Sequence, residues 1–160
     1  DGHQHIHQLP QVRELLLAEL ARRYSSAQRR TMWLRSTRAA PRAAQGDART
    51  AFKSAVIASL GRRALLRQAR ALGLQHNAHL LGVYDFTGGT SGYLARLQAW
   101  LAHAAPGDVL MCHPAHPSAA TDALAQARQD ELAVLTSSAF ATLLQRYAVR
   151  LQPLVGAGGV

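Results

Sequence analysis

The sequence predicts an α/β fold with a mainly parallel sheet and flanking helices. Predicted strands at 31–37, 79–86 and 108–113 alternate with longer stretches whose apolar residues recur at helical spacing. Strands that alternate with helices favour βαβ units, whose strands run parallel. A parallel sheet brings functional side chains to the carboxyl ends of its strands. Both the segment His3–His7 and His113 fall at such positions.

The strand predictions follow from composition and periodicity. HQHIHQ alternates with period two, TMWLRST combines β-branched and aromatic residues, and HLLGVYDF and DVLMCH are apolar. VRLQPL, near the C-terminus, is expected to be a last short strand. In chain order these strands cover residues 3–8, 31–37, 79–86, 108–113 and 149–154.

The helix predictions follow from apolar spacing and from residues that begin or end helices. Pro10 suits the first turn of a helix, Gly73 suits a C-cap, and Pro106-Gly107 ends a helix. Gly61 interrupts the second helical region. The expected helices cover residues 10–24, 49–72, 93–104, 121–133 and 137–147, and loops are expected at 38–48 and at the glycine-rich 87–92.

Size and composition indicate one ordered globular domain. The chain has 160 residues, of which 48% are hydrophobic and 17% are charged. No apolar run approaches the roughly 20 residues that span a bilayer, so we expect no membrane partner. The first residues do not resemble a signal peptide, and the single cysteine cannot form an internal disulfide, so a cytoplasmic location is expected. That cysteine, Cys112, is expected to be a small buried residue.

The net charge of +9 raises the question of nucleic-acid binding. Lys53 is the only lysine, and the arginines are scattered over several expected helices. Solvated helix faces account for most of these arginines, and the sequence has no zinc finger, RNA-recognition signature or basic zipper. We therefore expect no nucleic-acid partner.

Alternating histidines near the N-terminus suggest a metal site. On a regular strand His3, His5 and His7 project to one face, and imidazole is the commonest metal ligand. Neighbouring residues on one face lie roughly 6.5–7 Å apart, so one small ion rarely takes all three. We expect one or two ligands from this segment and the others from elsewhere. A tag remnant and a solvated polar terminus are the alternatives, and the spacing alone does not name a reaction.

Three segments together resemble the YdjC-like carbohydrate deacetylases. DGHQHIHQLPQV resembles the family's Asp-Ser/Gly-His-x-His-x-His segment, which a proline follows. DVLMCHPA resembles its late Cys-His-Pro-Ala/Gly strand end, and ARQDELAVLTS resembles the Arg-x-x-Glu-Leu-x-x-Leu-Thr/Ser stretch that comes next. GVYDF, with Tyr93 and Trp100-Leu101 after it, fits the region before the late histidine. The ordered set extends over most of the chain.

The resemblance implies a distorted (β/α) barrel and the hydrolysis of N-acetyl groups on amino sugars, notably chitooligosaccharides. It also implies a divalent metal, magnesium in the first place and zinc as the alternative. By position in the matching segments, His3 would be a metal ligand and His113 the general acid or a substrate-positioning group. The implied partner is an N-acetylated amino-sugar substrate. A homodimer is a separate expectation about partners and does not follow from the resemblance.

Two segments of the family have no counterpart in this sequence. One is an N-terminal Asp-Asp-Phe-Gly segment, which supplies a metal ligand and the catalytic base; the other is a Gly-x-His segment, which supplies another ligand. We therefore expect residues 1–160 to be the C-terminal part of a single deacetylase domain, with little or no activity by itself.

The remaining candidate site residues have less specific roles. Asp1 is expected to orient the histidine segment. His5 is expected to contact a metal ligand rather than to bind the ion itself. For His7 the alternatives are a residue at the helix start and a substrate contact. For Arg35 they are a hydrogen bond to sugar hydroxyls and a structural ion pair.

Four aromatic residues are expected in the core rather than in a sugar-binding platform: Trp33, Tyr84, Phe86 and Trp100. Two other classes of function stay open. One is a metallohydrolase that acts on an ester or a phosphate, and the other is a non-catalytic fragment or binding module.

Overall fold

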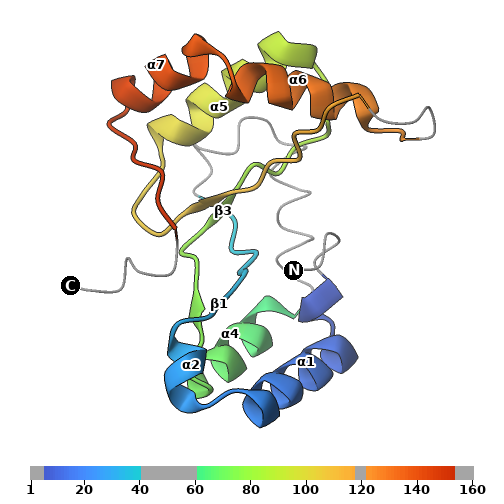
Figure 1. Cartoon of the computed structure of the whole chain (residues 1–160), viewed down its shortest axis with the longest axis vertical. Coiled ribbons are helices and arrows are strands. Elements are labelled where there is room, and N and C mark those ends of the chain that lie inside the picture. Colours follow the sequence, from blue (N-terminus) through green and yellow to red (C-terminus); the bar gives the residue numbers. More distant parts are fainter. Residues whose placement is uncertain (1–5, 41–60, 118–121, 154–160) are drawn as a thin grey trace.

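Two groups of helices lie at opposite ends of the molecule, with short parallel strands between them (Figure 1). The computed structural model describes residues 6–40, 61–117 and 122–153. In chain order its elements are η1 (Ile6–Gln8), α1 (Pro10–Arg23), α2 (Ser26–Arg30), β1 (Trp33–Leu34), α4 (Arg62–Ala71), β2 (Gln75–His76), β3 (Leu80–Leu81), α5 (Gly89–Ala102), β4 (Val109–Leu110), α6 (Ala125–Leu135) and α7 (Ser138–Arg146). No helix in these three ranges is long and apolar enough to cross a membrane.

All strand pairs of the described chain are parallel, as predicted. β1 pairs with β2, with Trp33 opposite Gln75, and β3 pairs with β4, with Leu80 opposite Val109. A parallel bridge between Ala39 and Leu80 brings the chain after β1 beside β3. Because α4 precedes β2 and α5 connects β3 to β4, the fold is α/β with βαβ connections. The described strands form two two-stranded sheets and do not close into a barrel.

The predicted strands were too long, and two of them are not strands in the part that the structure describes. Regular pairing covers only two residues of each of 31–37, 79–86 and 108–113. After β3 the chain leaves the ladder at Gly82, whose φ is +85°. Residues 149–153 form no strand, and the described part of 3–8 is the 3₁₀ turn η1, since it leads directly into the Pro10 turn of α1. No strand was predicted at β2.

The helix predictions were closer. α1, α6 and α7 lie where they were expected, and α4 covers the described part of 49–72. The loop expected at 87–92 is wrong in its last four residues, because α5 begins at Gly89 after an N-cap at Gly88 with φ of +92°. α2 was missed, although Ser25 and Gln28 form a reciprocal capping box at its start.

Two hydrophobic clusters hold the helices in place. In the first, α5 packs against α6 and α7, and its buried residues include Tyr84, Leu97 and Trp100. In the second, α1 and α4 pack against β1 through residues such as Leu17 and Leu65. Figure 1 shows the two helical groups at opposite ends of the strands. The predicted burial of Tyr84 and Trp100 is confirmed, and Phe86 is half-buried at the edge of the first cluster.

Two expectations of burial are wrong. Leu34 faces the second cluster, and because neighbouring residues on a strand face opposite sides, Trp33 faces outward and keeps 38% of its surface exposed. Cys112 is also exposed.

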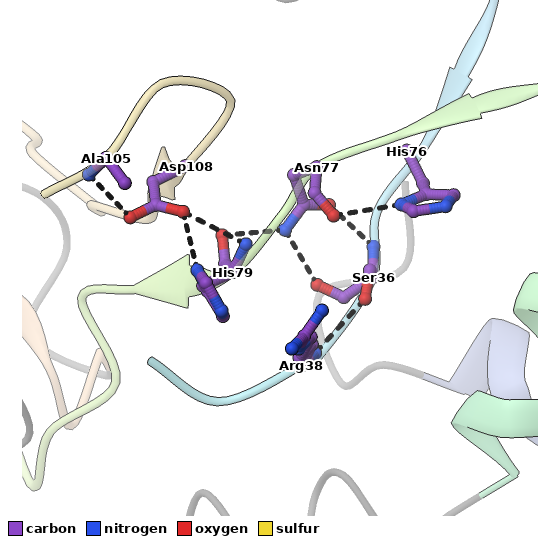
Figure 2. Close-up of polar contacts among 7 residues, drawn as sticks. All are labelled: Ser36, Arg38, His76, Asn77, His79, Ala105 and Asp108. Atoms are coloured by element: carbon purple, nitrogen blue, oxygen red, sulfur yellow. Dashed lines mark hydrogen bonds and ion pairs between the residues drawn. The ribbon is translucent and has the colours of Figure 1, made fainter. Parts of the chain in front are cut away.

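Buried polar side chains link the segments that follow β1 and β2 to the starts of β3 and β4 (Figure 2). The fully buried Asn77 accepts a hydrogen bond from the Ser36 N–H (2.7 Å) and donates to the carbonyls of Ser36 (2.9 Å) and His79 (2.8 Å). Asp108 accepts from the backbone N–H (3.1 Å) and Nδ1 (2.9 Å) of His79, and from the Ala105 N–H (3.0 Å). These bonds tie three chain segments together and fix where the strands that lead to the candidate site begin.

Candidate functional site

The candidate site lies where the chain continues beyond β3 and β4. Tyr84 and Phe86 follow β3, and His113 follows β4. The Met111 N–H donates to the Leu81 carbonyl (3.0 Å), which keeps the two segments side by side. The carboxyl ends of neighbouring parallel strands are where α/β folds collect functional groups. The helix α6 contributes Glu131 to the same place.

Glu131 is the central residue of the site and has no exposed surface. One carboxylate oxygen accepts a hydrogen bond from the hydroxyl of Tyr84 (2.7 Å), and the other accepts from the backbone N–H of His113. Nδ1 of His113 lies 3.8 Å from the first oxygen. Burial by itself raises the pKa of Glu131, but the hydrogen bonds from His113 and Tyr84 outweigh it and hold that pKa below its ordinary value. The carboxylate is therefore ionised and faces the imidazole.

The two tyrosines near Glu131 stay protonated. Burial raises the pKa of Tyr84, and its hydrogen bond to Glu131 raises it further. Burial also raises the pKa of Tyr93, and the charge of Glu131 adds to this. These hydroxyls are thus not suited to give up a proton near neutral pH. His113 carries the side-chain type that enzymes use most often for proton transfer.

An aromatic ring packs against the imidazole of His113. The ring of Phe86 meets it edge-on, with centroids 5.4 Å apart and planes at 69°. Tyr84 packs against Phe86 (4.7 Å) and against Trp100 (6.0 Å), which joins this wall to the first hydrophobic cluster. The side chain of His113 keeps only 11% of its surface exposed. The imidazole therefore lies in a largely apolar setting with one charged neighbour.

We expect the stability contribution of Glu131 to depend on pH. Because its pKa is lower in the folded chain than in the unfolded chain, the carboxylate stabilises the fold above the ordinary titration range of a glutamate. This contribution is lost as the pH falls through the lowered pKa. At about pH 7, Glu131→Gln is expected to reduce the free energy of unfolding by about 1–3 kcal/mol. Urea unfolding of both proteins between about pH 7 and about pH 3 measures the difference, which must shrink as the pH falls below the ordinary pKa of a glutamate; a constant difference would contradict the assignment.

Two further predicted site residues, His7 and Arg35, contact each other. Nε2 of the buried His7 donates to the carbonyl oxygen of Arg35 (2.9 Å), and burial lowers the pKa of His7. Nη1 of Arg35 lies 3.6 Å from Sδ of Met111, two residues before His113. His7 thus lies in η1 at the start of α1, and Arg35 reaches from the end of β1 toward the strand that carries His113.

The described residues do not form a metal site by themselves. No group of three or more His, Cys, Asp or Glu side chains that could hold an ion is present in 6–40, 61–117 or 122–153. Asp1, His3 and His5 lie outside the described residues. The structure therefore gives the geometry around His113 but not that of the predicted metal ligands.

Glu131 was not among the predicted site residues, although it belongs to one of the segments that resemble the family. A signal was present: Glu131 lies three residues before Val134, which is buried, so both share the inward face of α6. A carboxylate on the core face of a helix is rarely found without a partner. Its partners lie 18 and 47 residues away, at His113 and Tyr84, and no local pattern names them.

Comparison with known proteins gives one result. The model of a family described as YdjC-like protein matches residues 1–146 of the 160-residue chain. No curated protein and no solved structure matches the chain. The match includes all the segments that form the cluster around His113.

Proposed function

The chain belongs to the YdjC-like family, which is related to carbohydrate deacetylases. From this premise we propose that the protein functions as a metal-dependent hydrolase. The reaction is removal of N-acetyl groups from amino sugars such as chitooligosaccharides. The observation that carries the proposal is the buried Glu131 carboxylate facing His113 at the carboxyl ends of β3 and β4. As parts of the same proposal, the fold is a distorted (β/α) barrel and the location is cytoplasmic.

His113 is the proton donor in this proposal. Hydrolysis of an acetamide adds water to the carbonyl carbon and breaks the C–N bond, and the leaving nitrogen must receive a proton. A histidine can supply that proton near pH 7. Because Nδ1 faces Glu131, we assign the transfer to Nε2 on the other side of the ring. The products are acetate and the free amino sugar.

Glu131 orients that imidazole. Its carboxylate holds the backbone of His113 and faces Nδ1, while Tyr84 occupies part of its remaining hydrogen-bonding capacity. The same arrangement of a histidine and an orienting carboxylate recurs in enzymes that use histidine for proton transfer.

A divalent ion, magnesium or alternatively zinc, belongs to the proposal. When bound, it would polarise the acetyl carbonyl and lower the pKa of a water molecule. We assign one ligand to His3, with Asp1 and His5 supporting it and Arg35 as a candidate sugar contact. Since the described residues hold no ligand cluster, the roles above are derived from His113 and Glu131 alone.

A substrate panel tests the class of reaction. A form of the protein that includes any residues N-terminal to Asp1 would be given matched amide, ester and phosphate monoester substrates built on the same sugar. We expect release of acetate from the amide at the highest kcat/KM, and loss of bound metal and of turnover in His3→Ala. Preference for the ester or the phosphate would replace the proposal with a different metallohydrolase. Binding without turnover would indicate a binding module.

A further inference from the structure

The loop between β3 and α5 carries a strained residue beside His113. Phe86 has φ of +62°, in the left-handed region that non-glycine residues rarely adopt. Such a conformation persists only where the surroundings enforce it, and it often occurs at functional sites. In this conformation the ring of Phe86 lies edge-on against the imidazole of His113. Something in the structure must therefore hold the loop in this shape.

Arg96, about two helical turns into α5, holds both neighbours of Phe86. Its Nη2 donates to the carboxylate of Asp85 (3.2 Å), and its Nη1 donates to the carbonyl oxygen of Thr87 (3.0 Å). The same Asp85 oxygen accepts from the hydroxyl of Thr87 (2.8 Å), which closes the loop on itself. The guanidinium also lies over the ring of Tyr84, 5.2 Å from its centroid.

The sequence leaves room for this arginine. A Cβ atom on Gly92 would lie 3.0 Å from Nη1 of Arg96, and one on Gly88 would lie 3.2 Å from it. The guanidinium thus folds back along α5 through space that two glycines leave open. A lysine could not replace it, because a single ammonium does not offer the planar fork that reaches Asp85 and Thr87 together.

We propose that Arg96 is a positioning residue that fixes the orientation of the His113 imidazole through Phe86. Glu131 holds the backbone and the Nδ1 side of His113, and Phe86 packs against the ring itself. Rotation of the imidazole would require the Phe86 ring to move, and Arg96 opposes this by tying Asp85 to Thr87. The effect of Arg96 on turnover rests on the proposed function. Its effect on the orientation of the His113 imidazole does not depend on that proposal.

The test uses the 160-residue chain and the NMR signals of the imidazole C–H groups, which are assigned to His113 through their absence in His113→Gln. Phe86→Leu gives the change in chemical shift that follows from losing the ring. Arg96→Met and Asp85→Asn are each expected to shift or broaden the His113 signals to an extent comparable with Phe86→Leu. The double variant is expected to resemble either single one, because both break the same clamp. Arg146→Met, which removes an arginine at the end of α7, is the matched control and must leave these signals in place.

The outcomes separate this inference from the proposed function. Unchanged His113 signals in folded Arg96→Met and Asp85→Asn would overturn the positioning role, even if the variants were less stable. In the turnover assay, Arg96→Met is expected to lower kcat more than it raises KM, and Arg96→Lys to recover only part of the loss. If Arg96→Met and Asp85→Asn shift the His113 signals but His113→Ala loses no turnover, the positioning role of Arg96 is supported and the proposed function is rejected.

Discussion

Replacing His113 by alanine is expected to lower kcat for N-acetyl hydrolysis by about 10²–10⁴-fold, the contribution of a positioned general acid. The loss should fall on kcat rather than KM, because the proton is transferred only as the C–N bond breaks. The variant also loses an aromatic contact with Phe86, worth about 0.5–1.5 kcal/mol of stability. The effect on turnover is thus far larger than the effect on folding, and steady-state kinetics with thermal unfolding measures both.

His103→Ala is the matched control for this prediction. His103 is exposed at the C-terminal end of α5, so its removal is expected to leave kcat and stability near those of the parent. His113→Gln supplies a second variant that keeps a polar side chain of similar length. If folded His113→Ala retains turnover within a few-fold of the parent, the proton-donor role is wrong.

Gly82→Ala is expected to destabilise the chain by more than about 3 kcal/mol. With φ of +85°, this position carries the left-handed strain of roughly 1–3 kcal/mol for any other residue. In addition, a Cβ atom would lie 2.0 Å from the carbonyl oxygen of Met111, a distance that the backbone must relieve by moving. The movement would separate β3 from β4, and with them Tyr84 from His113. Chemical unfolding monitored by circular dichroism measures the loss.

Gly89→Ala separates the effect of backbone strain at a positive φ from the effect of a steric clash of the new Cβ atom. Gly89 also has a positive φ, +61°, but apart from its chain neighbours and the backbone of its own helix no heavy atom lies within 4 Å of a Cβ atom built there. Its replacement is expected to cost about 1–2 kcal/mol, the strain of one left-handed residue. Equal losses for Gly82→Ala and Gly89→Ala would show that the approach of Gly82 to Met111 is unimportant.

The fold class and the place of His113 could be predicted because both depend on local patterns. Apolar stretches of strand length alternate with helical stretches, and one of them ends on His113; parallel pairing then brings its carboxyl end beside that of β3. The length of the strands could not be predicted in the same way. It depends on Gly82 leaving the ladder and on the bonds of Asn77 and Asp108, which pair groups up to 41 residues apart.

Long-range pairing also explains what sequence analysis missed at the site. Glu131 and Arg96 look like ordinary charged residues of helices until the fold brings Tyr84, His113 and the Asp85 loop against them. His7 shows the opposite failure. A period-two pattern over six residues suggested a strand, but the ring of His7 bonds to a carbonyl 28 residues away from within a 3₁₀ turn.

The rate of acetate release from an N-acetylated chitooligosaccharide tests the central claim most directly. The measurement uses a form of the protein that includes any residues N-terminal to Asp1, before and after treatment with a chelator. We predict metal-dependent release of acetate that magnesium restores after chelation and that His113→Ala nearly abolishes. Release that continues at the same rate in folded His113→Ala, or no acetate from any N-acetylated amino sugar by the folded, metal-supplied protein, would contradict the account.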